Sequence, residues 1–365
     1  MNRVAQACTG LLSLWGVSLA VALAACSAGG DFSSGPNPNP TLVPFRVETF
    51  LSNANFPVTM AFAPDGRLFY NELHTGQVRV VQNGQLQSQP FATLAVDTNG
   101  ERGLLGLAID PNFAVNHFVY VYYSDPGGFH RLVRFTESSG VGTNQTTIVN
   151  IPRSNSNHNG GNIGFGRDGK LYVSVGDCGS PADSQNNAEF CGKILRFNSN
   201  GTIASDNTFC ATSPAFNLGL RNSFDFTFHP ASGAIYASEN GPNCDDEINR
   251  VVAGGNYGWR PNYPCGDTDP QFVAPLRRFN PVIAPTGIAF YTGTVFPQFR
   301  DGLFLVDFNN GRVQRFTVNE AMQGQITQSE IVVTGGFGQL LDVVQGPDGF
   351  LYFSSTTAIL RIVPQ

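Results

Sequence analysis

A histidine and an aspartate at the two ends of one expected β-hairpin are the chain's leading candidates for catalysis. His158 stands before Asn159-Gly160-Gly161 and an apolar strand, and Asp177 ends the next strand, LYVSVGD. Antiparallel strands return to the same edge of a sheet, so we expect the two side chains to meet. A neutral imidazole is the usual general base near neutral pH, and a neighbouring carboxylate stabilises its protonated form. The alternatives are a solvated turn histidine and an aspartate that only forms the turn before Cys178.

Arg221 and Asn222 occupy the same place before another strand, SFDFTF. A guanidinium there can bind an anion or stabilise negative charge that develops on oxygen. The alternative is a structural arginine bonded to loop carbonyls. We interpret His158, Asp177 and Arg221 together as the catalytic set.

The loop from Glu239 to Glu247 reads ENGPNCDDE and is rich in oxygen ligands. Carboxylates and backbone carbonyls are the ligands that calcium prefers, which makes Gly241, Pro242, Asp246 and Glu247 candidate metal ligands. The alternative is an acidic, solvated turn. The following loop, Gly254–Trp259, is interpreted either as a loop buttress or as a wall on which a substrate stacks.

Six similar segments carry these residues. In each, an apolar strand enters a turn of Pro, Asp, Asn and Gly type and leaves through an aromatic strand; a third short strand of the form V/I/L-x-R-V/F/I follows. The turn residues Gly66, Asn112, Gly169, Gly233, Gly302 and Gly349 repeat every 46 to 69 residues. A period of this length with several strands per repeat predicts an all-β fold, and six copies predict a six-bladed β-propeller.

In a ring of blades, the first residues of every innermost strand lie at the same end of the central channel. We call this end the mouth. These positions are Pro57-Val58, Glu101-Arg102, His158-Asn159, Arg221-Asn222, Pro285-Thr286 and Gln339-Leu340. We therefore expect a site at this mouth. To close the ring, the early strand Phe45–Phe50 is predicted to pair with the last strand, Ile359–Val363.

Charge and composition limit the partners of the chain. Of its 365 residues 13% are charged, the net charge is −6, and the only lysines are Lys170 and Lys193. No basic stripe is present to neutralise phosphates, so a nucleic-acid partner is not expected.

The N-terminal segment has the pattern of an export signal. Residues 1–25 combine Arg3, an apolar core and small residues, and Leu23-Ala24-Ala25-Cys26 resembles the lipobox of bacterial lipoproteins. The alternative is ordinary signal cleavage beside an unrelated cysteine. We expect a lipid anchor at Cys26, a polar tether over residues 26–43 and one propeller domain over residues 44–365. This organisation places the protein at the bacterial cell envelope, facing the periplasm or the exterior.

Five cysteines lie beyond this segment, and export permits disulfides. Because the number is odd, at least one stays unpaired or pairs elsewhere, and sequence does not fix the connectivity. The preferred local pairs are Cys178–Cys191 and Cys244–Cys265.

Several long strings resemble the glucose/sorbosone dehydrogenase family. They are, in chain order, GERGLLGLAIDPNF, HNGGNIGFGRDGKLYVSVGD, GKILRFNSNG, GLRNSFDFTFHPASG and DDEINRVVAGGNYGW, and the similarity extends over residues 50–365. Soluble members of that family are six-bladed propellers that bind pyrroloquinoline quinone (PQQ) with calcium and oxidise aldoses to lactones. The resemblance implies PQQ- and calcium-dependent oxidation of an aldose sugar or related polyol, with hydride transfer to the quinone and His158 as the base.

The resemblance also assigns roles around the cofactor. Asp177 would support His158, Arg221 and Asn222 would contact the quinone oxygens, and the backbone oxygens of Gly241 and Pro242 would hold the calcium.

The chain departs from the family pattern at four positions. Where PQQ-binding members have an Arg-x-Arg and a Lys, it has Gln339, Leu341 and Asn309, and Glu101 stands in place of a substrate-contacting Gln. We expect Glu101 to contact the substrate with His158, and Arg102 and Gln339 to join the cofactor site.

Two other classes of function compete with the dehydrogenase. One is a non-catalytic propeller that binds a glycan or protein partner at the cell envelope. The other is a calcium-dependent lactonase or esterase, which would use the same acidic residues with a metal-bound water.

Overall fold

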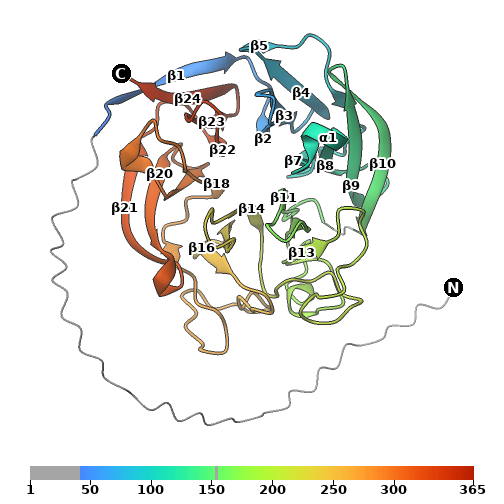
Figure 1. Ribbon diagram of the computed structural model, residues 1–365. Helices are drawn as coiled ribbons and strands as arrows, with labels where there is room; N and C mark the ends of the chain where they lie inside the picture. The colour runs from blue at the N-terminus through green and yellow to red at the C-terminus, as the bar shows by residue number, and fades with distance from the viewer. Residues whose placement is uncertain (1–41, 153–154) are drawn as a thin grey trace, which may run out of the picture.

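Six antiparallel sheets stand around one central axis (Figure 1), in a computed structural model that describes residues 42–152 and 155–365. The chain is a six-bladed β-propeller, as the repeats predict. The predicted signal, the lipidation site Cys26 and most of the tether fall outside the described residues. Val43 already bonds to the propeller, since its carbonyl accepts from Gln298 Nε2 at 2.8 Å. Among the described residues, no helix is long or apolar enough to cross a membrane.

The first three blades follow the chain from residue 57. Blade one has β2 (Pro57–Phe62), β3 (Leu68–Glu72), β4 (Gln77–Gln82) and β5 (Gln85–Leu86), with β6 (Ala92–Thr93) also paired to β4. Blade two has β7 (Leu104–Ile109), β8 (Phe118–Ser124), β9 (Phe129–Ser138) and β10 (Val141–Pro152), with the short helix α1 (Phe113–Asn116) between β7 and β8. Blade three has β11 (Ile163–Phe165), β12 (Leu171–Val175) and β13 (Lys193–Phe197).

The last three blades complete the ring. Blade four has β14 (Ser223–Phe228), β15 (Ile235–Glu239), β16 (Asp246–Val251) and β17 (Arg277–Phe279). Blade five has β18 (Pro285–Phe290), β19 (Gly302–Asp307), β20 (Val313–Asn319) and β21 (Gln325–Val333). Blade six has β22 (Leu340–Gln345), β23 (Leu351–Ser355) and β24 (Ala358–Pro364), and β1 (Phe45–Ser52) is its outer strand. Three single turns of 3₁₀ helix occupy loops, at Asp183–Gln185, Pro297–Phe299 and Glu320–Met322.

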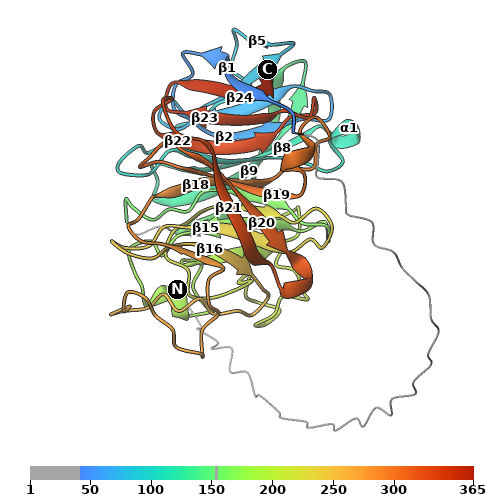
Figure 2. The same ribbon diagram turned by 90° about the vertical axis from the view of Figure 1, so that its left-hand side faces the viewer.

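Strand β1 closes the ring as predicted. It pairs antiparallel with β24, from Phe45 opposite Pro364 to Ser52 opposite Ala358. Figures 1 and 2 show these first and last strands side by side. Across the pair, Arg361 and Glu48 form an ion pair at 2.7 Å. The propeller is therefore held shut by hydrogen bonds between segments at opposite ends of the chain.

Blade three has three strands, whereas the other five sheets have four or five. Its outer edge is covered by the loop after β13, where Leu195 forms an isolated bridge with Ala215. The buried Asn207 side chain donates to the carbonyls of Arg196 and Ser213, both at 3.0 Å. Backbone bonds from Arg196 N to the Pro214 carbonyl and from Phe216 N to the Ile194 carbonyl, together with side-chain bonds, thus satisfy the strand edge where a fourth strand would otherwise lie.

Contacts between neighbouring innermost strands fix the blades around the axis. At the equivalent position of the six strands stand Thr59, Gly106, Asn162, Asp225, Gly287 and Asp342. The Asp342 carboxylate accepts the Met60 N–H of blade one at 2.6 Å, and Asp225 accepts the Ile288 N–H of blade five at 2.7 Å. At Gly106 a β-carbon would lie 2.3 Å from the Gly161 carbonyl oxygen, so only glycine fits there.

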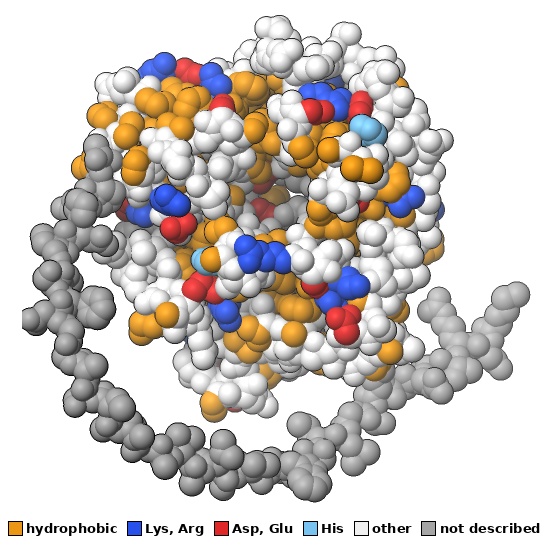
Figure 3. Space-filling model, viewed as in Figure 1, with side chains coloured by type: hydrophobic (Ala, Val, Ile, Leu, Met, Phe, Trp, Pro, Cys, Tyr) orange, Lys and Arg blue, Asp and Glu red, His pale blue; other side chains and the backbone are white. Residues whose placement is uncertain are grey.

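A hollow runs into the centre of the ring (Figure 3), and acidic side chains are visible inside it. The innermost strands of the blades line a cavity of about 510 Å³, in which Asp225 and Asp342 lie. A second cavity lies at the opposite end, where the innermost strands begin, and it is the mouth at which the sequence predicts a site.

Candidate active site

The mouth cavity has a volume of about 370 Å³ and an apolar floor. The floor comes from the second residue of five innermost strands: Val58, Leu105, Phe224, Thr286 and Leu341. The polar rim includes His74, Glu101, Asn222 and Asn240, and the described lining contains no Lys or Arg. Loops far apart in the sequence therefore meet at one mouth, as the repeat pattern predicts.

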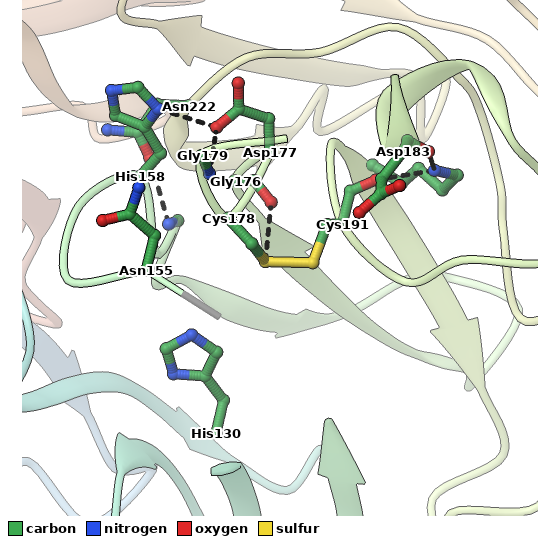
Figure 4. Close-up of a disulfide and its surroundings, with 12 residues drawn as sticks. His130, Asn155, His158, Gly176, Asp177, Cys178, Gly179, Asp183, Cys191 and Asn222 are labelled. Carbon is green, nitrogen blue, oxygen red and sulfur yellow. Dashed lines mark hydrogen bonds and ion pairs between the residues drawn. A yellow bond between two sulfur atoms is a disulfide. The ribbon is translucent and has the colours of Figure 1, made fainter. Parts of the chain in front are cut away.

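His158 and Asp177 form a close pair beside this mouth: neither lines the cavity itself, but the His158 backbone N–H bonds to the lining residue Glu101. His158 Nδ1 lies 2.7 Å from Asp177 Oδ1, and Figure 4 shows the two side chains facing each other. The aspartate side chain is 1% exposed and the histidine side chain 21%. An ionised carboxylate only accepts, so Nδ1 carries a proton; in the neutral imidazole, Nε2 is then the nitrogen with the free lone pair.

The Asp177 carboxylate is fully occupied by N–H donors. Gly179 N donates to Oδ1 at 2.8 Å, and Trp259 Nε1 donates to Oδ2 at 2.7 Å. Burial alone would raise the pKa of Asp177, but the hydrogen bonds from His158, Trp259 and Gly179 outweigh it and hold the pKa below its usual value. Asp177 is therefore charged at neutral pH and oriented from three sides.

A disulfide fixes the backbone directly after Asp177. Cys178 is bonded to Cys191 across 13 residues, next to the carboxylate in Figure 4. Beneath it, buried Lys193 donates to the carbonyls of Cys191 and Asp183, both at 2.6 Å. Burial lowers the pKa of Lys193 to about 7. Both predicted disulfides are confirmed, since Cys244 is bonded to Cys265.

Arg221 and Asn222 are joined to the same site. Asp177 N donates to the Arg221 carbonyl at 2.6 Å, and the Asn222 side chain accepts from Gly160 N at 3.0 Å. The Arg221 guanidinium donates to the Asn240 carbonyl at 2.9 Å, while its buried Nε has no partner among the described residues. Burial lowers the pKa of Arg221. The structure thus brings His158, Asp177, Arg221 and Asn222 together.

Buried Glu239, the last residue of β15, accepts hydrogen bonds from the backbone amides of Arg221 and Asn222. One oxygen accepts Arg221 N at 2.5 Å and Asn222 N at 2.8 Å, and the other has no partner among the described residues. Burial raises the pKa of Glu239 to about 8, against these two hydrogen bonds.

The candidate metal loop lies beside Glu239. Gly241 and Pro242 line a small cavity of about 20 Å³, together with Arg221, Glu239, Glu247 and Trp259. This volume accommodates one water or one ion. Its lining residues include Glu239 and Glu247, and hard cations prefer oxygen ligands, but Arg221 also lines it.

The two candidate side-chain ligands have partners in the protein. Asp246 accepts three backbone N–H groups, from Gly241, Ile283 and Ala284, and so shapes its own loop. Glu247 accepts from Arg278 and Asn249, and burial raises its pKa to about 7. Within 42–152 and 155–365, no three His, Cys, Asp or Glu side chains converge as a metal site. A calcium ion here would depend on the carbonyls of Gly241 and Pro242.

Three further predicted residues have different surroundings. Glu101 reaches the site, where its carboxylate accepts the His158 backbone N–H at 2.7 Å. Arg102 does not line the cavity; it is paired with Asp97 at 2.8 Å and bonded to the Asn155 carbonyl. Gln339 is exposed and does not line the cavity, whereas Leu341 does. The contribution of Arg102 and Gln339 to a cofactor site stays a prediction.

Sequence reasoning missed the roles of Glu239 and Trp259. Glu239 is the last residue of β15, whereas Asp177 lies two residues after the end of β12, so a search for acidic residues near the end of each second strand would have found both. Trp259 lies in a long loop, and the repeat pattern does not predict its contact with Asp177.

Comparisons with known proteins show the family of the chain. The chain matches the family model described as glucose/sorbosone dehydrogenase over residues 54–361. It is 28% identical over 350 residues to the aldose sugar dehydrogenase YliI of Escherichia coli (strain K12), covering 88% of this chain and 93% of that protein.

Two solved structures share the whole fold. The PQQ-bound aldose sugar dehydrogenase of Streptomyces coelicolor is 25% identical with a TM-score of 0.79, covering 90% of this chain and 100% of that one. A putative oxidoreductase (glucose dehydrogenase) of Thermus thermophilus is 31% identical with a TM-score of 0.79, covering 87% of this chain and 100% of that one.

Proposed function

The chain belongs to the glucose/sorbosone dehydrogenase family, and on this premise we propose that it oxidises an aldose sugar or related polyol with PQQ and calcium. The observation that carries the proposal is the His158–Asp177 pair at the propeller mouth, 2.7 Å apart, with Arg221 attached to Asp177 through the backbone. A base, a buried carboxylate and a cation are the groups that removal of a hydroxyl proton requires.

Part of the site suits a planar quinone, although no Lys or Arg is among the described residues that line the cavity. The apolar floor suits an aromatic ring system, and Arg221 Nε is a buried donor without a partner among the described residues. Arg221 and Asn222 would hold the quinone oxygens, and the carbonyls of Gly241 and Pro242 would hold calcium. Bound PQQ would supply the acceptor for the hydride, and calcium would polarise the accepting carbonyl.

His158 is the proton acceptor in this proposal. Its Nδ1–H is committed to Asp177, so Nε2 is the atom that takes the hydroxyl proton. The buried negative charge of Asp177 then stabilises the imidazolium that forms. Glu101 braces the same residue through its bond to the His158 backbone N–H and gives the rim a carboxylate that can bind a sugar hydroxyl.

We also propose that the protein is exported and anchored by a lipid at Cys26. The support is the sequence of residues 1–26, with Leu23-Ala24-Ala25-Cys26 at its end. A Cys26→Ser variant is expected to move from the membrane fraction to the soluble fraction. Equal membrane association of both forms would contradict the anchor.

The experiment is reconstitution of the purified protein with PQQ and calcium, followed by dye reduction with a panel of aldoses. His158→Ala is expected to lose activity. The control is His117→Asn, because His117 is half exposed and caps α1 with a positive φ that asparagine tolerates.

The mouth lacks a lining Lys or Arg among the described residues, an observation that favours the non-catalytic propeller. No quinone binding, with a glycan or protein bound instead, would establish that second function.

A further inference from the structure

Trp259 contacts both halves of the candidate site. Its indole Nε1 donates to Asp177 Oδ2 at 2.7 Å, and the Arg221 guanidinium carbon lies 5.4 Å from the centre of its ring. Asp177 Oδ2 has no other described donor, whereas Oδ1 receives both His158 Nδ1 and Gly179 N. By bonding to Oδ2, the indole helps fix the orientation of the buried carboxylate in which Oδ1 faces His158.

The position of the indole is fixed by contacts that do not involve Asp177. Trp259 N donates to the Gly219 carbonyl at 2.9 Å, and the Trp259 carbonyl accepts from Gln185 Nε2 at 2.7 Å. Tyr263 packs against the ring with centroids 5.3 Å apart. These contacts hold the N–H in place, so it can orient a carboxylate rather than follow it.

We propose that Trp259 is a positioning residue: its indole N–H holds the Asp177 carboxylate ionised and aimed at His158 Nδ1. The inference rests on the proposed function, because it assigns a role to a residue that does not accept the proton itself. A buried carboxylate oxygen that loses its only donor is costly to keep charged, so protonation of the pair becomes easier.

The kinetic test is Trp259→Phe, which removes the N–H and keeps an aromatic ring next to Arg221. A charge-assisted hydrogen bond of ~1.5 kcal/mol corresponds to about one pH unit. The acid limb of the kcat/KM profile is therefore expected to move up by about one unit, with a loss of roughly tenfold on that limb and little loss on the plateau. A merely structural role would lower kcat/KM equally at every pH, and this result would overturn the inference.

Two comparisons separate positioning from general destabilisation. Tyr291→Phe deletes a buried hydroxyl that donates to the Gly349 carbonyl at 2.7 Å in blade five, and it should leave the pH profile unchanged. In the background of Asp177→Asn, Trp259→Phe should cause no further loss of activity. An additive loss in the double variant would show that Trp259 does not act through Asp177.

A second measurement needs neither cofactor nor activity. The sequence contains only one other tryptophan, Trp15, so full-length Trp15→Phe protein has a single indole. The Trp259 indole N–H signal, followed by NMR in the cofactor-free protein, is expected to shift with pH as the His158–Asp177 pair titrates. In Asp177→Asn this titration should disappear. An indole N–H chemical shift that does not change with pH, or that changes equally in Asp177→Asn, would contradict the hydrogen bond.

The two readouts distinguish failure of the inference from failure of the proposed function. A titrating indole in a protein that oxidises no sugar supports the contact and overturns the dehydrogenase proposal. Sugar oxidation with an unmoved pH profile in Trp259→Phe supports the dehydrogenase and overturns the role of Trp259.

Discussion

Replacing Asp177 by asparagine tests the chemistry of the mouth without changing its shape. The carboxylate accepts His158 Nδ1 and Gly179 N on one oxygen and Trp259 Nε1 on the other. An asparagine side chain offers one oxygen and one NH₂ group, so at least one of these donors must face another donor. The favoured orientation keeps the oxygen toward His158 and Gly179, and it leaves the Trp259 indole opposed to the NH₂ group.

The expected loss follows from these bonds. A hydrogen bond to a charged group contributes about 1.5–3 kcal/mol, and the charge itself is what stabilises the imidazolium when His158 takes a proton. Loss of that stabilisation in the transition state corresponds to a fall in kcat/KM of roughly 10- to 150-fold. The unfolding free energy should fall by about 1–3 kcal/mol, because a buried donor loses its acceptor.

The assay is steady-state dye reduction by the PQQ-reconstituted protein, together with thermal unfolding of each variant. The matched control is Asp206→Asn, whose side chain is 65% exposed and whose partner Arg196 keeps its second ion pair with Asp168. A loss below threefold in folded Asp177→Asn, or an equal loss in the control, would refute the reasoning that the buried charge supports His158.

Three further outcomes are expected. Replacing Cys178 and Cys191 by serine should cost about 3 kcal/mol of stability in thermal melts and lower kcat/KM, because the disulfide holds the backbone after Asp177; unchanged activity would contradict this clamp. Gln339→Arg should tighten PQQ binding roughly tenfold in a spectroscopic titration by supplying a cation at the mouth, whereas equal affinity would show that the position is too far away. Burial raises the pKa of Asp342 to about 7, so between about pH 4 and pH 7 the folded state binds more protons than the unfolded state. The unfolding free energy should therefore fall as the pH rises through this range. Thermal melts of Asp342→Asn should show a smaller fall.

The fold was predictable because one local pattern repeats six times. Each copy places an apolar strand, a turn and an aromatic strand in the same order. A wrong strand assignment in one blade therefore does not change the predicted number of blades. The closing pair β1–β24 followed from the need to join the ring, and its register runs as far as Ser52 opposite Ala358. The strand number of blade three was the exception. The side chain of Asn207 covers part of its strand edge, and the periodicity of a sequence does not predict such a bond.

The candidate site was predictable only where it lies on strands. His158 and Asp177 flank one hairpin, so antiparallel geometry alone brings them together. Arg102 also precedes a strand, and its guanidinium is paired with Asp97, a partner that strand position does not predict. Trp259 belongs to a loop whose path depends on contacts with Gly219 and Gln185, which are distant in sequence and have no periodic signal.

The central claim is that sugar oxidation at the mouth depends on His158 as the proton acceptor. The most direct measurement is a single-turnover experiment in which the PQQ-loaded protein is mixed with an aldose, without dye, and the quinone spectrum is followed. The account predicts reduction of the bound quinone in the wild type and none, or far slower reduction, in His158→Ala that binds PQQ equally well. Equal rates in the two proteins, or no reduction in the wild type with any aldose, would contradict it.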